Sequence, residues 1–462
     1  MSLLESISSP GLSPLSRRDW LGTVGGGFAT LGLAGALRAA ETAQPRPLTV
    51  PKVKRVIQLF MNGGPFQGDL FDPKPRINEF AGQRPQEVQL RTENATGGLM
   101  AVPYKYDRHG TSGLEISDLL PRLSAHADDL CVLRSMHTDN PNHGPALFMM
   151  NNGTITPLRP SMGSWMLYGL GSENENLPGY VVLCPGRPVR FSEMWTNSFL
   201  PAQHQGTYIN HSDLAPDKMV PFLKNPVLDI DSQRKQLAFL RELNTEHLAT
   251  RDADPALEGR IRAMETAFRM QFAASDAFDL AREPAALREE YGSSHFSNGC
   301  LLARRLVERG VRLVQVYYGD GQPWDTHRTH DELTRKLCAD IDRPIAALLA
   351  DLKRTGLLDD TLVVWGGEFG RTPTSESGNG RDHNHWGFTM WLAGAGVRGG
   401  MAYGATDDFG FRAVQDKVHV HDLHATILHL MGLDHERLTY RHAGRDYRLT
   451  DLYGRVVHEI LV

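Results

Sequence analysis

The stretch "CLLARRLVERGVRLVQVYYGDG", Cys300 to Gly321, determines the fold class that the sequence predicts. Its first half is predicted to be a helix that ends near Gly310, and its second half is a short β-rich run. A helix that leads directly into a buried strand is the repeating unit of a parallel sheet, because parallel neighbours need a crossover connection. The stretch therefore indicates an α/β protein.

The same alternation recurs along the chain between residues 52 and 462. The run "VKRVIQLFMNGG" (53–64) is predicted to be a buried strand that opens into a glycine loop, and residues 331–358 and 359–370 repeat the helix-then-strand order. We therefore expect one α/β domain over 52–462, with a mostly parallel sheet and helices on both faces. Residues from about 216 to 291 are charged and poor in β-branched side chains, which predicts a helical insertion or a cap over the sheet.

Composition excludes several classes of protein. A net charge of -5 and a pI of about 6.4 provide no basic field for nucleic acid or for an anionic membrane. The four cysteines lie far apart without a C-x-x-C pair, which excludes a disulfide scaffold and a cysteine-type zinc site. No stretch after the N-terminal segment is apolar enough to span a bilayer. We expect no nucleic-acid partner and no transmembrane segment in the mature chain.

The N-terminus, residues 1–43, is predicted to be a twin-arginine signal peptide with its linker. Arg17 and Arg18 stand before a mildly hydrophobic run rich in glycine and alanine, and small residues suited to cleavage follow. The alternative is a single membrane anchor, which the many glycines disfavour. The twin-arginine export machinery, the expected partner, carries folded proteins, often with a metal already bound. The mature chain is therefore expected in the periplasm or outside the cell.

Polar side chains follow the predicted strands where each strand ends, and in open parallel sheets ligands bind at that edge. Carboxylate and neutral imidazole together suit zinc, manganese or iron, whereas oxygen ligands alone suit calcium. We therefore expect a divalent metal site at this edge. The polar side chains at the strand ends are Asn62, Asp69, Asp72, His137, Asp139, His143, Asp320, Asp325, His327, His330, Glu368, Arg371, Asp382, His383 and His385.

Some of these residues have simpler explanations than metal binding. Asp325 and His327 could form only a surface hydrogen-bonded pair, whereas two imidazoles one residue apart in "DHNH" (382–385) seldom serve packing. Glu368 follows a buried strand, so its charge needs a cation, either a metal or Arg371. Arg371 is expected to pair with a carboxylate or to clamp an anion. Structural histidines are expected where the spacing is mostly helical, at His419, His421, His424 and His429.

Taken together, these motifs are similar to the export-tagged bacterial family named domain of unknown function 1501, within the alkaline phosphatase and sulfatase superfamily. The resemblance covers nearly the whole mature chain and includes "GGPFQGDLFDPKP" (63–75), "WDTH" (324–327), "GEFGRTP" (367–373) and "GRDHNHWG" (380–387). It implies a sulfatase-like α/β fold. It also implies the superfamily's chemistry, in which one or two metals assist the hydrolysis of phosphate or sulfate esters.

The match to the superfamily's metal ligands is partial at the first strand and at a later one. Asn62 and Gly63 stand where sulfatases have two metal-binding aspartates. Asn62 could still ligate through its carbonyl oxygen, or Asp69 could substitute. In the later strand Glu368 takes the place of the superfamily's acid, and Phe369 replaces the second ligand.

Two further segments resemble the superfamily's ligand set more closely. Asp325 and His327 resemble its Asp and His metal pair, with altered spacing, and His383 or His385 resembles its late histidine. The resemblance therefore implies a divalent metal, zinc, manganese or calcium, held among these residues and Glu368.

The segment "NHGPALFMMNNG" (142–153) fits the frame of the sulfatase nucleophile motif, with proline two residues and glycine ten residues after His143. His143 then occupies the nucleophile's position at a helix N-terminus, where amide groups favour an anion. Ala146 and Leu147 replace the serine and arginine of that motif, which excludes formylglycine chemistry. His143 is expected to be a base or a metal ligand rather than a covalent nucleophile.

The sequence thus predicts an exported, metal-dependent hydrolase of sulfate or phosphate esters, acting on a small-molecule or glycan ester. His143 and Arg371 are its predicted catalytic residues. A second interpretation is a non-catalytic binding or structural protein on the same scaffold, because its metal ligands differ at Asn62, Gly63 and Phe369. A third is an exported redox enzyme with a mononuclear metal, which only the export of folded protein supports.

Overall fold

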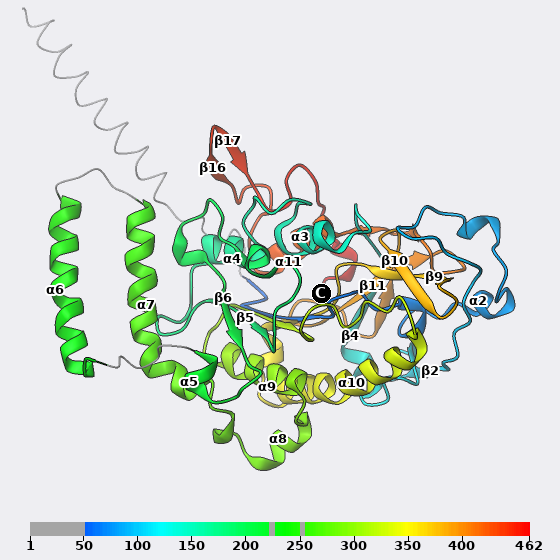
Figure 1. Ribbon diagram of the computed structural model, residues 1–462, viewed down its shortest axis with the longest axis horizontal. Helices are drawn as coiled ribbons and strands as arrows, with labels where there is room; N and C mark the ends of the chain where they lie inside the picture. The colour runs from blue at the N-terminus through cyan, green and yellow to red at the C-terminus, as the bar shows by residue number, and fades with distance from the viewer. Residues whose placement is uncertain (1–50, 221–226, 250–254) are drawn as a thin grey trace, which may run out of the picture. The chain divides into compact units, whose positions relative to one another are not determined.

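Nine strands form the central sheet of the chain, whose computed structural model describes residues 51–220, 227–249 and 255–462 (Figure 1). Eight of them lie in the order β12 (Met401–Tyr403), β4 (Leu130–His137), β11 (Phe388–Gly394), β8 (Thr361–Gly366), β1 (Arg55–Phe60), β7 (Leu313–Tyr317), β5 (Tyr180–Cys184) and β6 (Thr207–Asn210). The ninth, β15 (Val418–His419), pairs with β4. Every pairing is parallel except those of β11 with β4 and β8, which confirms the predicted mostly parallel sheet.

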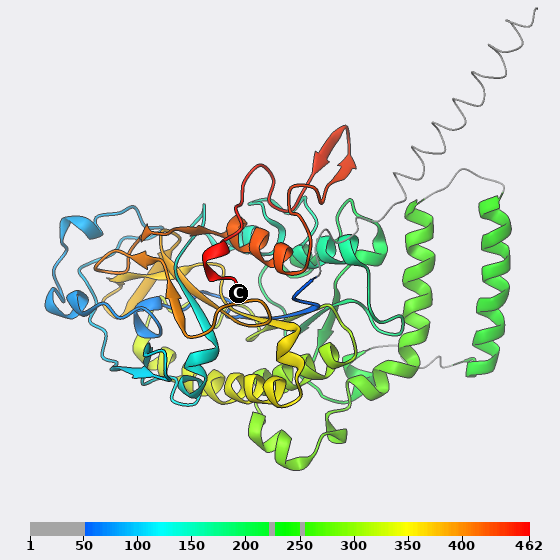
Figure 2. The same ribbon diagram turned by 180° about the vertical axis from the view of Figure 1, so that it is seen from behind.

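Helices cover both faces of this sheet, as the two opposite views show (Figures 1 and 2). One layer contains α3 (His143–Asn152), α4 (Met162–Leu170) and α11 (Val420–Leu430), and the other contains α8 (Ala285–Tyr291), α9 (His295–Glu308) and α10 (His330–Arg354). Successive side chains of a strand point to opposite faces, so a strand between two helical layers is apolar throughout. In β1, Ile57 and Leu59 join the core of the α9 and α10 layer, whereas Val56 and Phe60 join the core of the α3 layer. The predicted α/β class is confirmed.

The stretch from Cys300 to Gly321 forms the end of α9, a tight turn and the whole of β7. The start of α9 is capped by Ser294, whose hydroxyl accepts a hydrogen bond from the Ser297 amide at 3.1 Å. Gly310, just after the helix, has a φ of 83°, a conformation in which glycine avoids the steric cost of a side chain. All five residues of β7 are buried between β1 and β5.

Residues 216–291, where the sequence predicts an insertion, are largely helical in their described parts. They contain α5 (Pro216–Met219), α6 (Ile230–Ala249), α7 (Pro255–Ala277), a short 3-10 helix (Leu280–Arg282) and α8. Met270 and Ala274 of α7 reach the core beneath α9, and Arg241 of α6 donates to Glu265 of α7 at 2.6 Å. This segment therefore adds a helical pair to the α9 side of the sheet.

Small elements build the walls around the carboxyl ends of the strands. The β9–β10 hairpin (Gly370–Glu376 and Gly380–Asn384) follows β8 directly and carries several of the predicted site residues. The remaining helices and strands are α2 (Pro75–Glu79), β2 (Tyr106–His109), β3 (Leu114–Ser117), β13 (Ala405–Thr406), β14 (Ala413–Gln415), β16 (Tyr440–His442) and β17 (Arg445–Tyr447). Further 3-10 segments are Gln67–Asp69, Gln86–Val88, Leu123–Asp129, Phe191–Trp195, Ala202–His204, Leu357–Asp359 and His458–Ile460.

The predicted export signal, residues 1–43, lies outside the described residues. Within the residues that the structure describes, no helix has the length and apolar character needed to cross a membrane. All four cysteines are buried and free.

Candidate metal centre

Four segments that are far apart in the sequence meet at the carboxyl edge of the sheet. The loop after β7 supplies Asp325 and His327, and β10 supplies His383. The loop between β8 and β9 supplies Glu368. His143 is the first residue of α3, which follows β4, and the Asn142 side chain caps that helix by accepting from the Gly144 amide at 3.2 Å. Because β1, β7 and β8 are adjacent and parallel, their ends bring these side chains together.

Three imidazoles converge on one oxygen of Asp325. The Nε2 atoms of His327, His383 and His143 lie 2.9, 3.2 and 3.2 Å from Asp325 Oδ1. The Nε2 atoms of His327 and His383 are 3.0 Å apart. The candidate ligand atoms of these four residues all lie within 4.8 Å of one another. We call His143, Asp325, His327 and His383 the histidine cluster.

Each histidine of the histidine cluster has its other ring nitrogen on a carboxylate. The Nδ1 of His143 lies 2.7 Å from Glu368, and the Nδ1 of His383 lies 2.7 Å from Glu93. The Nδ1 of His327 is hydrogen-bonded to Glu376 in the same way.

Ionised carboxylates only accept hydrogen bonds, so each Nδ1 of the histidine cluster carries the proton and donates it to its carboxylate. In the neutral form of each ring, Nε2 then turns a lone pair toward the centre of the cluster. This is the arrangement by which proteins fix the tautomer and ring orientation of metal-binding histidines.

Glu368 is fully buried and is itself held in place by the backbone. The amide of Gly63 donates to both of its oxygens, at 3.0 and 3.2 Å. Gly63 has a φ of 114°, and a Cβ there would lie 2.4 Å from the backbone nitrogen of Asp325. The glycine that follows Asn62 therefore allows the loop after β1 to approach both Glu368 and Asp325.

Arg371, predicted as a catalytic residue, lies fully buried beneath the histidine cluster. Its Nη2 donates to Asp325 Oδ1 at 2.5 Å and also to the Gly63 carbonyl, while its Nε donates to the Gly64 carbonyl at 3.1 Å. The sequence allowed two roles for Arg371, pairing with a carboxylate or clamping an anion. The structure shows it paired with a carboxylate, that of Asp325. Arg371 holds the Asp325 carboxylate in place.

Electrostatics in the histidine cluster favour ionised acids. Burial raises the pKa of Asp325, but the three imidazoles and Arg371 outweigh burial and hold that pKa well below its usual range. The Asp325 and Glu376 carboxylates raise the pKa of His327 to about 9, against the effect of burial. Burial lowers the pKa of His143, but Asp325 and Glu368 together leave it raised.

The residues present fit a divalent cation. Four carboxylates surround the cluster: Asp325, Glu368, Glu93 and Glu376. Of these, in the described residues, Asp325 alone is bonded to a guanidinium, that of Arg371, so neutral imidazoles leave negative charge uncompensated. Lone pairs that face one another at 3.0 Å repel unless a proton or a metal lies between them. A divalent metal bound there would remove this repulsion, because it takes an electron pair from each Nε2.

Phe369 packs against two rings of the histidine cluster. Its ring centroid lies 4.7 Å from that of His143 and 4.8 Å from that of His383, and the residue is 1% exposed. Where the superfamily resemblance implies a second ligand, this chain therefore has an apolar wall that keeps water from one side of the cluster.

Four of the predicted metal ligands, Glu368, Asn62, Asp69 and His385, lie outside the histidine cluster. The oxygens of Glu368 accept from His143 Nδ1 and the Gly63 amide, so Glu368 lies behind the cluster rather than in it. Asn62 donates through Nδ2 to the carbonyls of Gly319 and Gly321, at 3.0 and 2.5 Å, so it ties the loop after β1 to the loop after β7. The Oδ2 of Asp69 lies 2.7 Å from the Nε2 of His330, a histidine that is not part of the histidine cluster. The backbone carbonyl of His385 accepts from the Thr138 amide, and burial lowers its ring pKa to about 4.

Sequence reasoning missed Glu93 and Glu376. Glu93 lies in an irregular loop and reaches both His383 and the side chain of Asn142, to which it is bonded at 3.0 Å. Nothing in its local sequence distinguishes it from a solvated surface acid. Glu376 ends β9 and faces His327 because the hairpin turns back at that point, so a hairpin prediction over 370–384 is the signal that could have found it.

Two of the predicted structural histidines fasten the other end of α3. The Nε2 of His424 donates to the Met150 carbonyl at 2.9 Å, and the Nε2 of His421 donates to the Gly153 carbonyl at 3.0 Å. Burial lowers the pKa of both, to about 3 for His424. They are neutral donors to the C-terminal end of the helix that carries His143.

The fold and the histidine cluster define an α/β protein with a group of possible metal ligands at the carboxyl edge of a mostly parallel sheet. The chain belongs to the family described as "Protein of unknown function (DUF1501)", whose model matches residues 53–461. The resemblance to that family seen in the sequence is thereby confirmed. No curated protein matches the sequence.

Several solved structures are similar to the chain at low sequence identity. The lipoteichoic acid synthase LtaP from Listeria monocytogenes is 10% identical, with a TM-score of 0.37 over 82% of this chain and 72% of its own. The PsFucS1 sulfatase from Pseudoalteromonas sp. is 12% identical, with a TM-score of 0.35 over 86% and 70%. The periplasmic domain of EcEptC from Escherichia coli, in complex with Zn, is 11% identical, with a TM-score of 0.35 over 86% and 88%. Such low scores carry no argument about function, which must come from the histidine cluster.

Proposed function

We propose that this chain is an exported, metal-dependent hydrolase of sulfate or phosphate esters. One observation carries the proposal: three imidazole Nε2 atoms converge on one carboxylate oxygen. The Nδ1 atom of each ring is hydrogen-bonded to a different carboxylate, which fixes the ring's orientation. Asp325, His327 and His383 are the metal ligands, and His143 at the N-terminus of α3 is poised at the substrate as the base. Imidazole ligands favour zinc or manganese over calcium, which prefers oxygen ligands.

When bound, a divalent cation supplies a Lewis acid that polarises the ester and stabilises charge on its oxygens. The chain's own residues prepare that chemistry. Glu368 keeps the proton of His143 on Nδ1, so that Nε2 is free to ligate the cation or to accept a proton. Arg371 neutralises part of Asp325 and fixes its position, and Phe369 excludes water behind the imidazoles.

The test is hydrolysis of an aryl sulfate and an aryl phosphate by the purified protein, with zinc or manganese added and with chelator. We expect metal-dependent release of the aryl alcohol from at least one ester. His143→Ala should reduce kcat by roughly 100-fold or more, as the loss of a base or ligand at the reacting centre does. Equal turnover in wild type and His143→Ala would remove His143 from the mechanism, and no turnover with metal present would remove the hydrolase.

A second candidate function follows from the number of ligands. If His143 ligates, the metal has four protein ligands, and closed four-ligand zinc sites are usually structural. A non-catalytic binding or structural protein is then expected, in which chelation lowers the melting temperature but no ester is hydrolysed. His143→Ala separates the two, because loss of a catalytic base leaves the metal affinity unchanged, whereas loss of a fourth ligand lowers it.

Export is part of the proposal and rests on Arg17 and Arg18 with the apolar run that follows. Fractionation of cells that express the full chain tests it. We expect the mature protein in the periplasm or the medium, and retention in the cytoplasm when both arginines are changed to lysine. Equal export of the two forms would contradict the twin-arginine route.

A further inference from the structure

A cavity of about 580 Å³ lies beside the histidine cluster, at the N-terminal end of α3. The start of α3 lines it with Asn142, His143 and Gly144. The loop after β5 lines the other side with Arg190, Phe191 and Glu193. The cavity therefore joins the proposed site to a loop that neither the sequence motifs nor the histidine cluster include.

Arg190 is exposed, and its guanidinium forms no ion pair among the residues that the structure describes. It does not extend freely into solvent, because it lies 5.7 Å over the ring of Phe148 in α3. A Cβ at Gly144 would lie 2.8 Å from the Arg190 Nε, so the absence of a side chain there lets the guanidinium rest against the first turn of α3. An uncompensated cation is thus fixed at the positive end of a helix.

His143, where the cavity borders the histidine cluster, provides a second sign of a ligand. It is 8% exposed, and its Nε2 has no hydrogen-bond partner in the described chain although it lies near the Asp325 carboxylate. A buried polar atom without a partner is costly unless something else binds there. Arg190, the helix terminus and His143 all border the same space, and all three favour an anionic ligand.

The charge around the cavity is small, however. Among the described residues, Arg190 is the only cationic side chain that lines it, and Glu193 on the same loop is acidic. Glu93 is bonded to Asn142 at 3.0 Å, and Glu368 lies directly behind His143. With neutral imidazoles and a divalent cation in the cluster, the four positive charges of the cation, Arg190 and Arg371 are still outnumbered by five carboxylates, those of Glu193, Glu93, Glu368, Asp325 and Glu376. This balance disfavours a second negative charge on the ligand.

On these grounds we propose that Arg190 recognises a singly charged tetrahedral ester group, as in a sulfate monoester or a phosphodiester, in preference to a doubly charged phosphate monoester. This inference rests on the proposed function, because it places the reacting group of the substrate between Arg190 and the histidine cluster. Phe191 and the neighbouring Val189 are half-buried on the cavity wall and would face the organic part of the ester.

Binding of two probes that cannot be hydrolysed tests the charge preference without need of turnover. Benzylsulfonate and benzylphosphonate share one shape and differ by one charge, at a pH where the phosphonate is doubly ionised. With zinc-loaded protein, titration calorimetry should give a lower Kd for benzylsulfonate. Arg190→Ala should raise that Kd by at least about tenfold, the loss expected for a hydrogen-bonded charged partner, and Arg190→Lys should restore part of it.

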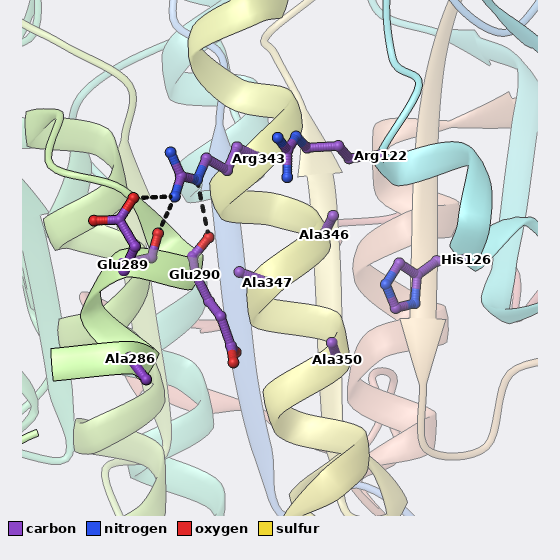
Figure 3. A pocket seen from close by; sticks show the side chains of 9 residues that line it. All are labelled: Arg122, His126, Ala286, Glu289, Glu290, Arg343, Ala346, Ala347 and Ala350. Carbon is purple, nitrogen blue, oxygen red and sulfur yellow. Dashed lines mark hydrogen bonds and ion pairs between the residues drawn. The ribbon is translucent and has the colours of Figure 1, made fainter. Parts of the chain in front are cut away.

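Arg122 provides a matched control. It is also exposed and lines a cavity, of about 530 Å³, on the opposite helical layer beside the alanines of α10 (Figure 3). Arg122→Ala removes the same charge from the protein and should leave both Kd values unchanged. Equal binding of benzylsulfonate by wild type and Arg190→Ala, or tighter binding of the phosphonate, would overturn the proposal.

Turnover separates this inference from the proposed function. Nitrophenyl sulfate and bis-nitrophenyl phosphate distinguish the two singly charged ester classes, and nitrophenyl phosphate represents the doubly charged class. Hydrolysis of esters with no dependence on Arg190 sinks the inference and leaves the hydrolase. Arg190-dependent binding of benzylsulfonate with no hydrolysis of any ester supports the anion site and sinks the hydrolase.

Discussion

Histidines lie at both ends of α3, and the two ends differ in what the second ring nitrogen contacts. At the N-terminal end, His143 places Nδ1 on the buried Glu368 and turns Nε2 toward Asp325 and two further imidazoles. At the C-terminal end, His421 and His424 place Nε2 on backbone carbonyls, and their Nδ1 atoms have no hydrogen-bond partner in the described residues. Burial lowers the pKa of the second group, whereas carboxylates raise that of His143.

The comparison shows that surroundings, not residue type, determine what a histidine does here. A carboxylate hydrogen-bonded to Nδ1 makes Nε2 a stronger electron-pair donor, which favours binding of a metal or a proton at Nε2. When Nε2 donates to a backbone carbonyl, the only N–H of the neutral imidazole is used. Such a histidine caps the C-terminal end of α3 and has a structural role. The first group should therefore control metal and activity, and the second should control stability alone.

The largest expected effect is that of Asp325→Asn. The amide keeps the size of the side chain but removes the charge on which three imidazoles converge. We expect metal affinity to fall by more than about 100-fold, beyond the usual loss for a residue behind a ligand. Competition with a fluorescent zinc chelator measures it. Unchanged affinity would mean that the histidine cluster does not hold the metal.

Glu93→Gln removes the carboxylate that is hydrogen-bonded to a proposed metal ligand, His383. Glu93 fixes the Nδ1 of His383 at 2.7 Å, so its loss frees that ring to rotate and weakens the ligand. We expect metal affinity to fall by roughly 10- to 100-fold. Glu87→Gln, an exposed acid in the same region of the chain, is the control and should have no effect. If both variants bind metal like wild type, Glu93 is only a surface acid.

His424→Ala probes the other end of α3. The change leaves the Met150 carbonyl without its donor and opens a cavity, which should cost about 2–3 kcal/mol in the free energy of unfolding. Urea denaturation measures this loss, and metal content should stay unchanged. His458→Ala, at an exposed histidine, should be neutral. Loss of metal from His424→Ala with little loss of stability would remove the distinction between the two ends.

The smallest expected effect is a change in pH dependence. The unfolded chain protonates His424 near pH 6.5, whereas the folded imidazole stays neutral down to a pKa of about 3. The unfolded state therefore binds more protons below about pH 6.5, and stability falls as the pH is lowered, by about 1.4 kcal/mol per pH unit for this one group. His424→Leu should flatten the profile by that amount between pH 6.5 and 5. Parallel profiles would show that His424 does not stay neutral on folding.

Much of the fold could be predicted from sequence because its signals are local. The run from Cys300 to Gly321 carries its own helix end, turn and strand, and the strand ends mark the edge where ligands collect. The sequence places Asp325, His327 and His383 at this edge in that way, since each lies in the loop after a strand or in the hairpin that follows one. Their exact partners could not be predicted, because those depend on loops.

Asn62 and Glu93 show why the rest could not be predicted. Asn62 occupies a ligand position by chain order, but its side chain turns toward the carbonyls of the loop after β7. Glu93 lies 290 residues before the histidine that it orients, in a loop with no periodic pattern. The resemblance placed a second ligand at Phe369, where the structure has an apolar wall. Only the folded chain decides these orientations.

The most direct test of the account is the metal content of the purified mature protein, measured by mass spectrometry before and after chelation. The account predicts one divalent metal per chain or more, a lower melting temperature after chelation, and neither property in Asp325→Asn. Protein that contains no metal after expression with zinc and manganese supplied, and whose melting temperature chelation does not change, would contradict it.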